Sequence, residues 1–321
     1  MKRVLVVDAL NQFIRMYITD PSLSVNGDPI GGMKGFLMAI QKITREVKPD
    51  AVVVAWDGPG GSMRRKQTVK EYKEGRAPLR LNRSIDLTDD EQYENRTRQQ
   101  FKLFEILNAT PIIQLCLEGV EADDIISFTC QSERFRDWQK VIVSSDKDFY
   151  QLLDEKTVLL RPAQKQYVNM NNVIEDFDIH PNNFALARAI SGDKSDNLPG
   201  IPGVGMKTVA KRFPFLKEKK EYLLDDLIKY SDNLEEKAKV HKVLRENKDL
   251  VLTNYKMMQL ASPMLNFEDT QKLNYVFDNH VPEFNGTEFQ KLAIKEGFPQ
   301  VNFADLFTTF KRIIKEHKDS A

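Results

Sequence analysis

The stretch VLVVDALNQF, residues 4–13, shows a design that the chain uses more than once. Four apolar residues, three of them β-branched valines, follow one another without alternation and lead into Asp8. A short continuous apolar run is typical of a strand that is covered on both faces of a sheet. The stretch therefore predicts a buried strand with a carboxylate at its carboxyl end.

Two further stretches have the same build. AVVVAWD (51–57) ends at Asp57 before the breaker GPGG, and KVIVSSD (140–146) ends at Asp146 with Asp148 just beyond. Segments with helical spacing lie between the strands, such as MKGFLMAIQKITREV (33–47) and RQQFKLFEILNA (98–109). Strands that alternate with helices predict a parallel α/β sheet, in which ligand sites form beyond the carboxyl ends of the strands. We therefore expect these acids at one edge of one sheet.

The stretch GVEADDII (119–126) adds three acids directly before apolar residues. Each acid alone is explained as helix-start chemistry, because the helix dipole favours negative charge there. Carboxylates brought together repel one another, and so they take up protons or hold cations. All-oxygen ligands suit Mg²⁺ or Mn²⁺, and the four histidines form no HxxxH or HxH pair that would favour zinc.

A second group of acids occurs in ISGDKSDNLPGIPGVGMKTVAKRF (190–213). Asp193 and Asp196 are three residues apart, a spacing that predicts one face of a helical turn. The glycine turns at Gly203 and Gly205 lead into a segment with helical spacing that begins near Lys207. Backbone N–H groups at such a turn, together with the positive end of a helix, predict a phosphate-binding site.

The composition is that of an ordinary globular protein, with 321 residues, 41% of them hydrophobic and 29% charged. No apolar run approaches the roughly 18 residues of a membrane helix, and the first residues lack a signal-peptide pattern. Only two cysteines occur, in no metal-ligand spacing, which favours a reduced cytoplasmic protein.

A net charge of zero hides a local imbalance. Residues 62–84 hold eight Lys or Arg and two Glu, a balance of +6. A neutral chain can therefore carry a basic track beside an acidic pocket. The alternative is a solvated charged surface.

These segments, in this order, resemble the 5′-nuclease family. Its members include bacteriophage 5′-exonucleases and flap endonucleases, the phage RNase H type and the N-terminal domain of bacterial DNA polymerase I. The most specific likenesses are GVEADDII, VSSDKDFYQLL and GDKSDNLPGIPGVGMKT, while MRRKQTVKEYKEGR resembles the family's arch. The resemblance fades past about residue 265.

The resemblance implies two groups of metal ligands, all of them acids, for at least two Mg²⁺ or Mn²⁺ ions. The first group is Asp8, Asp57, Glu121, Asp123 and Asp124, and the second is Asp146, Asp148, Asp193 and Asp196. It also implies that Lys73 is an electrostatic catalyst and that Arg76 supports it. The implied DNA contacts are Arg15, Lys34, Arg65, Tyr72, Gly203, Gly205 and Lys207, with K⁺ as a further ion at the glycine turns.

The fold expected from this resemblance is a PIN-like parallel twisted sheet flanked by helices, with a helical arch and a C-terminal helical part. We expect a catalytic core over 1–185 with the arch at about 58–100. A helix–two-turn–helix region that binds duplex DNA should span 186–265. An extension over 266–321 should pack on the core, and its last helix, FADLFTTFKRIIKEH, either docks there or presents a surface to a partner.

The resemblance implies a structure-specific 5′→3′ exonuclease and 5′-flap endonuclease, active in DNA replication in the cytoplasm of a bacterial or phage-infected cell. Its expected partners are duplex DNA with a flap, nick or free 5′ end, RNA–DNA hybrid primers, and single-strand-binding or other replication proteins. Two alternatives remain open. One is a branched-DNA-binding protein without turnover, which the intact second acid group disfavours. The other is a PIN-like ribonuclease acting on single-stranded RNA, which would need neither the arch nor the glycine turns.

Overall fold

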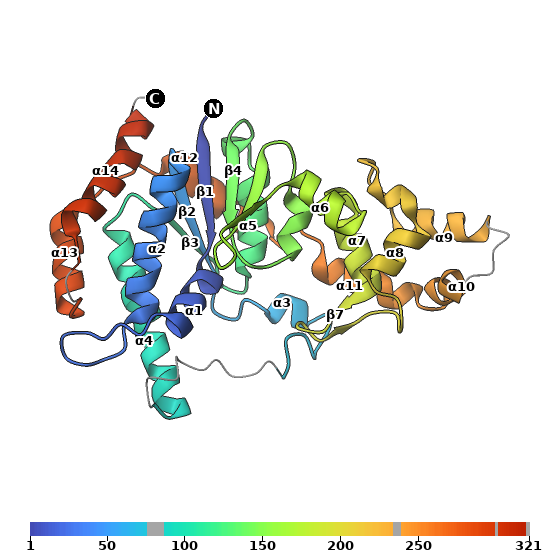
Figure 1. The fold of residues 1–321 in the computed structure, drawn as a ribbon, viewed down its shortest axis with the longest axis horizontal. Helices are drawn as coiled ribbons and strands as arrows, with labels where there is room; N and C mark the ends of the chain where they lie inside the picture. Colours follow the sequence, from blue (N-terminus) through green and yellow to red (C-terminus); the bar gives the residue numbers. More distant parts are fainter. Residues whose placement is uncertain (76–86, 234–238, 299–300, 319–321) are drawn as a thin grey trace.

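The computed structural model describes residues 1–75, 87–233, 239–298 and 301–318, in which a sheet is covered by helices on both faces (Figure 1). The main sheet of this part of the chain has the order β3-β2-β1-β4-β5-β6. Its neighbouring strands are parallel from β3 to β5, and β6 is antiparallel to β5. The strands are β1 (Arg3–Asp8), β2 (Ala51–Trp56), β3 (Ile113–Cys116), β4 (Gln139–Val143), β5 (Thr157–Arg161) and β6 (Gln166–Val168). The predicted α/β sheet is confirmed.

Successive residues of β1 pack into two different hydrophobic cores. Val4 and Val6 belong to the core under α5 (Ala122–Gln131), α7 (Pro181–Ser191) and α12 (Phe267–Asn279). Leu5 and Val7 belong to the other core, under α1 (Ala9–Thr19), α2 (Gly31–Val47), α4 (Asp89–Asn108), α13 (Gly286–Lys295) and α14 (Phe303–Lys318). Burial on both faces explains why the strand sequence is apolar without alternation.

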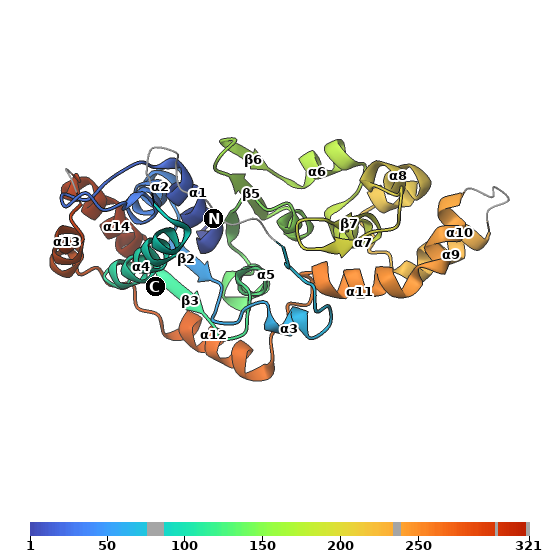
Figure 2. The same cartoon turned by 90° about the horizontal axis from the view of Figure 1, so that it is seen from below.

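A helical region extends from one side of the sheet (Figures 1 and 2). It begins with α7, which packs along α11 (Lys248–Met258). The hairpin of β7 (Gly192–Asp193) and β8 (Leu198–Pro199) then leads to α8 (Met206–Arg212). Asn254 ties α11 to this unit, because its side-chain amide donates to the backbone oxygens of Ala189 and Pro199 at 3.0 and 2.8 Å.

The other described helices are short or connect the larger ones. They are α3 (Met63–Lys66), η1 (Glu133–Phe135), η2 (Asp148–Leu152), α6 (Met170–Phe177), η3 (Pro214–Lys217), α9 (Leu224–Asp232) and α10 (Lys239–Glu246). None of the described helices is long and apolar enough to cross a membrane.

The two expected domain limits lie at different places relative to the helices. The expected boundary at 185/186 falls inside α7, a continuous helix that packs both on the core and on α11. The limit at 265/266 lies directly before α12, which returns to the core with Phe277 against Phe128 and Phe135.

The last helix docks on the core, as one of the two expectations had it. Phe310 and Ile313 of α14 are buried in the core beneath α2. At the edge of this contact, Asp305 accepts a hydrogen bond from Gln41 at 3.0 Å and pairs with Arg45. A ring cluster around Phe284, Phe289 and Phe307 holds α13 beside it.

Candidate active site

The acids at the carboxyl ends of β1 and β2 are held in place by hydrogen bonds. Asp8 caps α1, where one carboxylate oxygen accepts the N–H of Asn11 at 3.1 Å and the other accepts the hydroxyl of Ser144 at 2.8 Å. Asp57 follows β2 and accepts the N–H of Ala122 at 3.0 Å. Because Ala122 opens α5, this bond joins the end of β2 to the helix that carries the next acids.

The start of α5 brings Glu121, Asp123 and Asp124 to the same edge. Glu121 has an extended backbone at the N-cap, and the two aspartates occupy the first turn. Ile125 and Ile126 are buried in the core beneath them. The predicted helix start is confirmed, with its apolar residues anchoring the turn that carries the acids.

Burial and mutual repulsion raise the pKa of several of these acids. Burial raises the pKa of Asp8 to about 7, against the hydrogen bonds from Ser144 and Asn11, and repulsion from Asp57 and Asp146 adds to the rise. Burial also raises the pKa of Asp123 well above its ordinary value, and repulsion from Asp146 adds to it. Carboxylates from β1, β2, α5 and the segment after β4 therefore lie within reach of one another's charge.

The second acid group has the same character and its own cation. Burial raises the pKa of Asp148 to about 7, and repulsion from Asp146 adds to the rise. Arg188, from the last turn of α7, opposes this rise, because its Nε donates to Asp148 at 3.2 Å and its Nη2 pairs with Asp193. Sequence reasoning missed Arg188, although a basic residue in the last helical turn before an acid pair was a usable signal.

Asp193 and Asp196 do not lie on a helical turn, so this prediction was wrong. Asp193 belongs to β7, and residues 194–197 form the turn of the hairpin, in which Asn197 has a φ of +59°. Gly192 and Gly200 explain the difference, because a Cβ at Gly200 would lie 2.1 Å from the backbone oxygen of Ser191. Only glycine permits this close approach of the two hairpin arms.

Residues 63–75, which we call the limb, bring cations to the first acid group. The Nζ of Lys73 donates to Glu121 at 2.8 Å, and its backbone N–H donates to the carbonyl of Asp196 at 3.0 Å. Attraction to Glu121 and Asp123 raises the pKa of Lys73, although burial, the largest influence, acts in the opposite direction. Lys73 has a φ of +57°. The structure thus places Lys73 between the two acid groups.

Two predicted DNA contacts in the limb are interior side chains. Arg65 is 3% exposed and pairs with Asp124 and Glu121. Tyr72 is also 3% exposed, packs with Leu198 and Met257, and donates its hydroxyl to Glu121 at 3.2 Å. In this arrangement neither side chain presents a surface to DNA. Arg76 lies outside the described residues.

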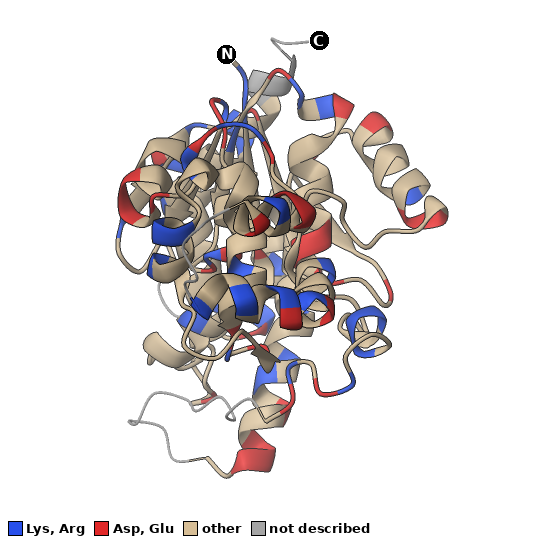
Figure 3. Cartoon of the chain, turned by 90° about the vertical axis from the view of Figure 1, so that its right-hand side faces the viewer, with Lys and Arg blue, Asp and Glu red and all other residues tan. Residues whose placement is uncertain are grey.

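Three of the five basic residues in the described part of the expected basic track pair with acids, while Lys66 and Lys70 are exposed. Arg64 pairs with Asp269 at 2.6 Å, and Arg65 and Lys73 are paired as described. At the far end of the helical region, acidic and basic residues are interleaved along the ribbon (Figure 3).

Two further predicted DNA contacts, Lys34 and Arg15, lie in α2 and α1. Lys34 donates to the hydroxyl of Ser22 at 3.0 Å. The Nη1 atom of Arg15 is buried and has no hydrogen-bond partner among the described residues, and burial lowers the pKa of this guanidinium. Gly31 and Gly32 allow α1 and α2 to pack closely, because a Cβ at Gly31 would lie 1.9 Å from the backbone oxygen of Asp20.

The glycine turns lie in a separate, open hollow. The hollow is a cavity of about 530 Å³, lined by Ser191, Gly192, Lys194 and residues 197–205 of the hairpin and its following turn. Gly203 has a φ of +77°, Gly205 caps α8, and a Cβ at either position would meet no atom within 4 Å. Lys207 is exposed in the first turn of α8. This hollow gives a ligand direct access to the backbone.

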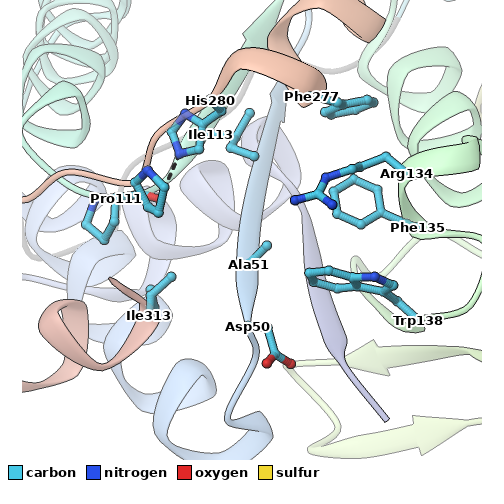
Figure 4. A pocket seen from close by; sticks show the side chains of 11 residues that line it. Asp50, Ala51, Pro111, Ile113, Arg134, Phe135, Trp138, Phe277, His280 and Ile313 are labelled. Carbon is cyan, nitrogen blue, oxygen red and sulfur yellow. Dashed lines mark hydrogen bonds between the residues drawn. The ribbon is translucent and has the colours of Figure 1, made fainter. Parts of the chain in front are cut away.

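A small cavity at the opposite edge of the sheet is an unsuitable alternative site (Figure 4). It is lined by Asp50, Arg134, Trp138 and His280, among others, at the amino ends of β2 and β3. Its volume of about 20 Å³ holds about one water molecule. Asp50 also accepts the N–H of Arg3 at 2.6 Å.

The donor set at the carboxyl edge fits a hard divalent cation, because all its charged donors are carboxylates and several are destabilised by burial and repulsion. In the part of the chain that the structure describes, no group of three or more Asp, Glu, His or Cys side chains is arranged to hold a metal ion. Lys73 and Arg188 instead hold three of the acids, Glu121, Asp148 and Asp193.

The chain thus has two parts, a parallel sheet with acids at its carboxyl edge and a helix–hairpin–helix region that follows it. The model of the 5′-3′ exonuclease N-terminal resolvase-like domain matches residues 3–178, and that of the 5′-3′ exonuclease C-terminal SAM fold matches residues 179–276. The chain belongs to the 5′-3′ exonuclease family.

Individual relatives agree with this assignment. The 5′-3′ exonuclease of Aquifex aeolicus is 31% identical over 211 residues, which are 65% of this chain and 68% of the relative. The thermostable DNA polymerase I of Thermus thermophilus is 30% identical over 243 residues, 74% of this chain but 27% of the polymerase. The chain thus spans about a quarter of the length of that polymerase.

Solved structures show the same fold. The bacteriophage T5 5′-exonuclease with bound divalent metal ions has a TM-score of 0.69 at 18% identity, over 87% of this chain and 99% of that one. The T5 flap endonuclease in complex with DNA and metal ions has a TM-score of 0.64 at 17% identity, over 97% and 100%. At this identity the likeness supports the fold alone.

Proposed function

We propose that this protein is a divalent-metal-dependent, structure-specific 5′ nuclease. It acts as a 5′→3′ exonuclease on nicked or free duplex ends and as an endonuclease on 5′ flaps, leaving 5′-phosphate products. The observation that carries the proposal is the cluster of buried, mutually repelling carboxylates with Lys73 between its two groups. Membership of the 5′-3′ exonuclease family supports it.

The acids hold at least two Mg²⁺ or Mn²⁺ ions in this proposal. The ligands are drawn from Asp8, Asp57, Glu121, Asp123, Asp146, Asp148, Asp193 and Asp196. Such ions activate water and neutralise charge on the scissile phosphate. Asp124 is left out, because its carboxylate is engaged by Arg65.

Lys73 supplies the positive charge that the protein itself adds to the phosphate. Its ammonium now lies on Glu121 and in the field of Asp123. When a phosphate enters, we expect Lys73 to exchange Glu121 for a phosphate oxygen, where negative charge builds up in the transition state. Arg76 is proposed as the neighbouring cation that holds the 5′ strand.

The helical region grips the duplex away from the cut. The open backbone at Gly203 and Gly205 and the exposed Lys207 suit a DNA phosphate. K⁺ is proposed as a further ion at these glycine turns. Arg15 and Lys34 are proposed as further DNA contacts near the centre. Phosphate contacts position a duplex without reading its sequence.

The proposed setting is DNA replication in the cytoplasm of a bacterial or phage-infected cell. RNA–DNA hybrid primers are proposed substrates beside flapped DNA, and single-strand-binding or other replication proteins are proposed partners. The bacterial origin of the named relatives supports this setting.

A labelled 5′-flap duplex tests the proposal. We expect release of the flap near the junction with Mg²⁺ or Mn²⁺, and none with a chelator. Tight binding without cleavage in either metal would show a branched-DNA-binding protein instead. Cleavage of single-stranded RNA in preference to the flap duplex would show a PIN-like ribonuclease.

A further inference from the structure

The guanidinium of Arg65 is held on three sides inside the protein. Its Nη1 and Nη2 donate to the two oxygens of Asp124 at 2.6 and 3.2 Å, a bidentate pair. Its Nε donates to the backbone oxygen of Met257, in α11, at 3.0 Å. This planar fork matches a carboxylate in a way that a lysine ammonium does not.

Arg65 also reaches the first acid group through Glu121. Its Nη1 lies 3.0 Å from one oxygen of Glu121, and the hydroxyl of Tyr72 donates to the same oxygen at 3.2 Å. The other oxygen accepts from Lys73 at 2.8 Å. Glu121 is therefore oriented from three directions, each by a residue of the limb.

Asp124 completes the arrangement as a counter-ion. It is 1% exposed, and the oxygen that accepts from the Nη2 of Arg65 also accepts the N–H of Met264 at 2.9 Å. Both its oxygens are thus engaged by the protein. A buried carboxylate with these partners is suited to fixing Arg65 and poorly suited to leaving it for an ion.

We propose that Arg65 is a positioning residue that fixes Glu121, and with it the contact to Lys73, while Asp124 serves as its fixed counter-ion. The inference rests on the proposed metal-dependent function, because Glu121 is one of the ligands named there. Through Met257, the same side chain joins the limb to the helical region. Arg65 therefore acts on the ion and the reacting phosphate through Glu121, without touching DNA.

Three variants separate this role from the others. Arg65→Lys keeps the charge and loses the fork. The double variant Arg65→Gln with Asp124→Asn removes both charges together and so leaves neither buried and unpaired. Lys66→Gln is the control, because it removes one charge from an exposed position on the same short helix. Thermal unfolding of each variant shows whether it folds.

Three measurements are then compared with the wild-type protein. They are Mn²⁺ binding by calorimetry, the affinity for a flap duplex in chelator at several salt concentrations, and the single-turnover rate in Mg²⁺. We expect both Arg65 variants to bind Mn²⁺ about tenfold more weakly and to cleave at least about tenfold more slowly, as is typical when a residue that orients a ligand is lost. Their DNA affinity and its salt dependence should match the wild type.

Two outcomes would overturn the proposal. If Arg65→Lys or the double variant weakens DNA binding while Mn²⁺ affinity is unchanged, Arg65 contacts the phosphate backbone of the DNA. The double variant should in that case also lower the salt slope by about 0.9. If both fold and match the wild type in Mn²⁺ affinity and rate, Arg65 only stabilises the fold. Mn²⁺ calorimetry needs no turnover. If the wild-type protein binds Mn²⁺ but leaves the flap uncut, the proposed nuclease activity is rejected, while the Mn²⁺ affinities of the variants still test the role of Arg65.

Discussion

Glu121 and Asp193 both belong to the proposed metal centre, but the groups that fix them come from different distances along the chain. Glu121 is held by Lys73, 48 residues away, and by Tyr72, 49 residues away. Asp193 is held by Arg188, five residues away, and by the N–H and hydroxyl of Ser195, two residues away, at 2.7 and 2.6 Å.

This difference predicts that Glu121 is more sensitive than Asp193 to the position of the limb. The geometry of Glu121 depends on where the limb lies, and the limb leads directly into residues 76–86. Asp193 is fixed within the helix and hairpin that carry it. A substrate that shifts the limb should therefore alter Glu121 more than Asp193, although the limb also bonds the hairpin turn through the N–H of Lys73 and the carbonyl of Asp196.

The largest expected effect is at Lys73, where the two groups meet. Lys73→Ala should lower the single-turnover cleavage rate by roughly 100- to 1,000-fold, the range for loss of one donor to developing charge. DNA affinity should change little. The control is Lys70→Ala, at an exposed position of the same limb. A wild-type rate in Lys73→Ala would mean that the ammonium only balances Glu121.

The next effect tests whether the second group serves chemistry rather than binding. Asp148→Asn keeps the size of the side chain and removes a negative charge from the group that Arg188 balances. We expect cleavage to fall by about 10- to 100-fold with duplex affinity nearly unchanged. Equal damage to cleavage and to affinity, measured by gel shift in chelator, would make Asp148 a structural residue.

A third prediction concerns the local support of the second group. Arg188→Gln leaves Asp148 and Asp193 without their shared cation, so the metal-free protein should lose about 1 to 3 kcal/mol of unfolding free energy, the cost of leaving a partly buried polar group without its partner. Saturating Mg²⁺ should restore more stability to this variant than to the wild type, because the ion replaces the missing positive charge. Thermal melts with and without Mg²⁺ measure both effects. Equal gains from Mg²⁺ would show that the ion binds elsewhere.

The smallest effect lies in the helical region, away from both groups. Gly205 has a negative φ and open space around its Cα, so Gly205→Ala should fold normally. If the DNA backbone approaches this turn, affinity for a duplex should weaken about fivefold, equivalent to about 1 kcal/mol for one lost contact. The single-turnover rate at saturating DNA should stay the same. Unchanged affinity would remove Gly205 from the duplex site.

The strands that carry acids were predictable because each is a continuous apolar run between clear breakers. The edge strand β3 was missed, since it is four residues long and Gln114 interrupts its apolar pattern. The hairpin was mistaken for a helical turn because carboxylate spacing says nothing about the close backbone contact at Gly200.

The candidate site was predictable as a set of residue types and much less as a set of contacts. The acids and Lys73 stand in recognisable segments. The engagement of Asp124 by Arg65 depends on packing between segments 59 residues apart, which no local pattern records. The contact of Arg188 with Asp148 joins positions 40 residues apart, which become neighbours only in the fold.

The backbone at Lys73 adds a constraint on what this position can become. A φ of +57° is a left-handed conformation that glycine adopts freely and that costs a lysine about 1 kcal/mol or more. Gly75, two residues on, has a φ of +72°, so the turn already uses glycine where handedness alone matters. A protein engineer who optimised this turn for stability would choose glycine at 73 as well. Such a change would relieve the backbone strain at position 73 and remove the ammonium, so the same substitution would increase stability and slow catalysis.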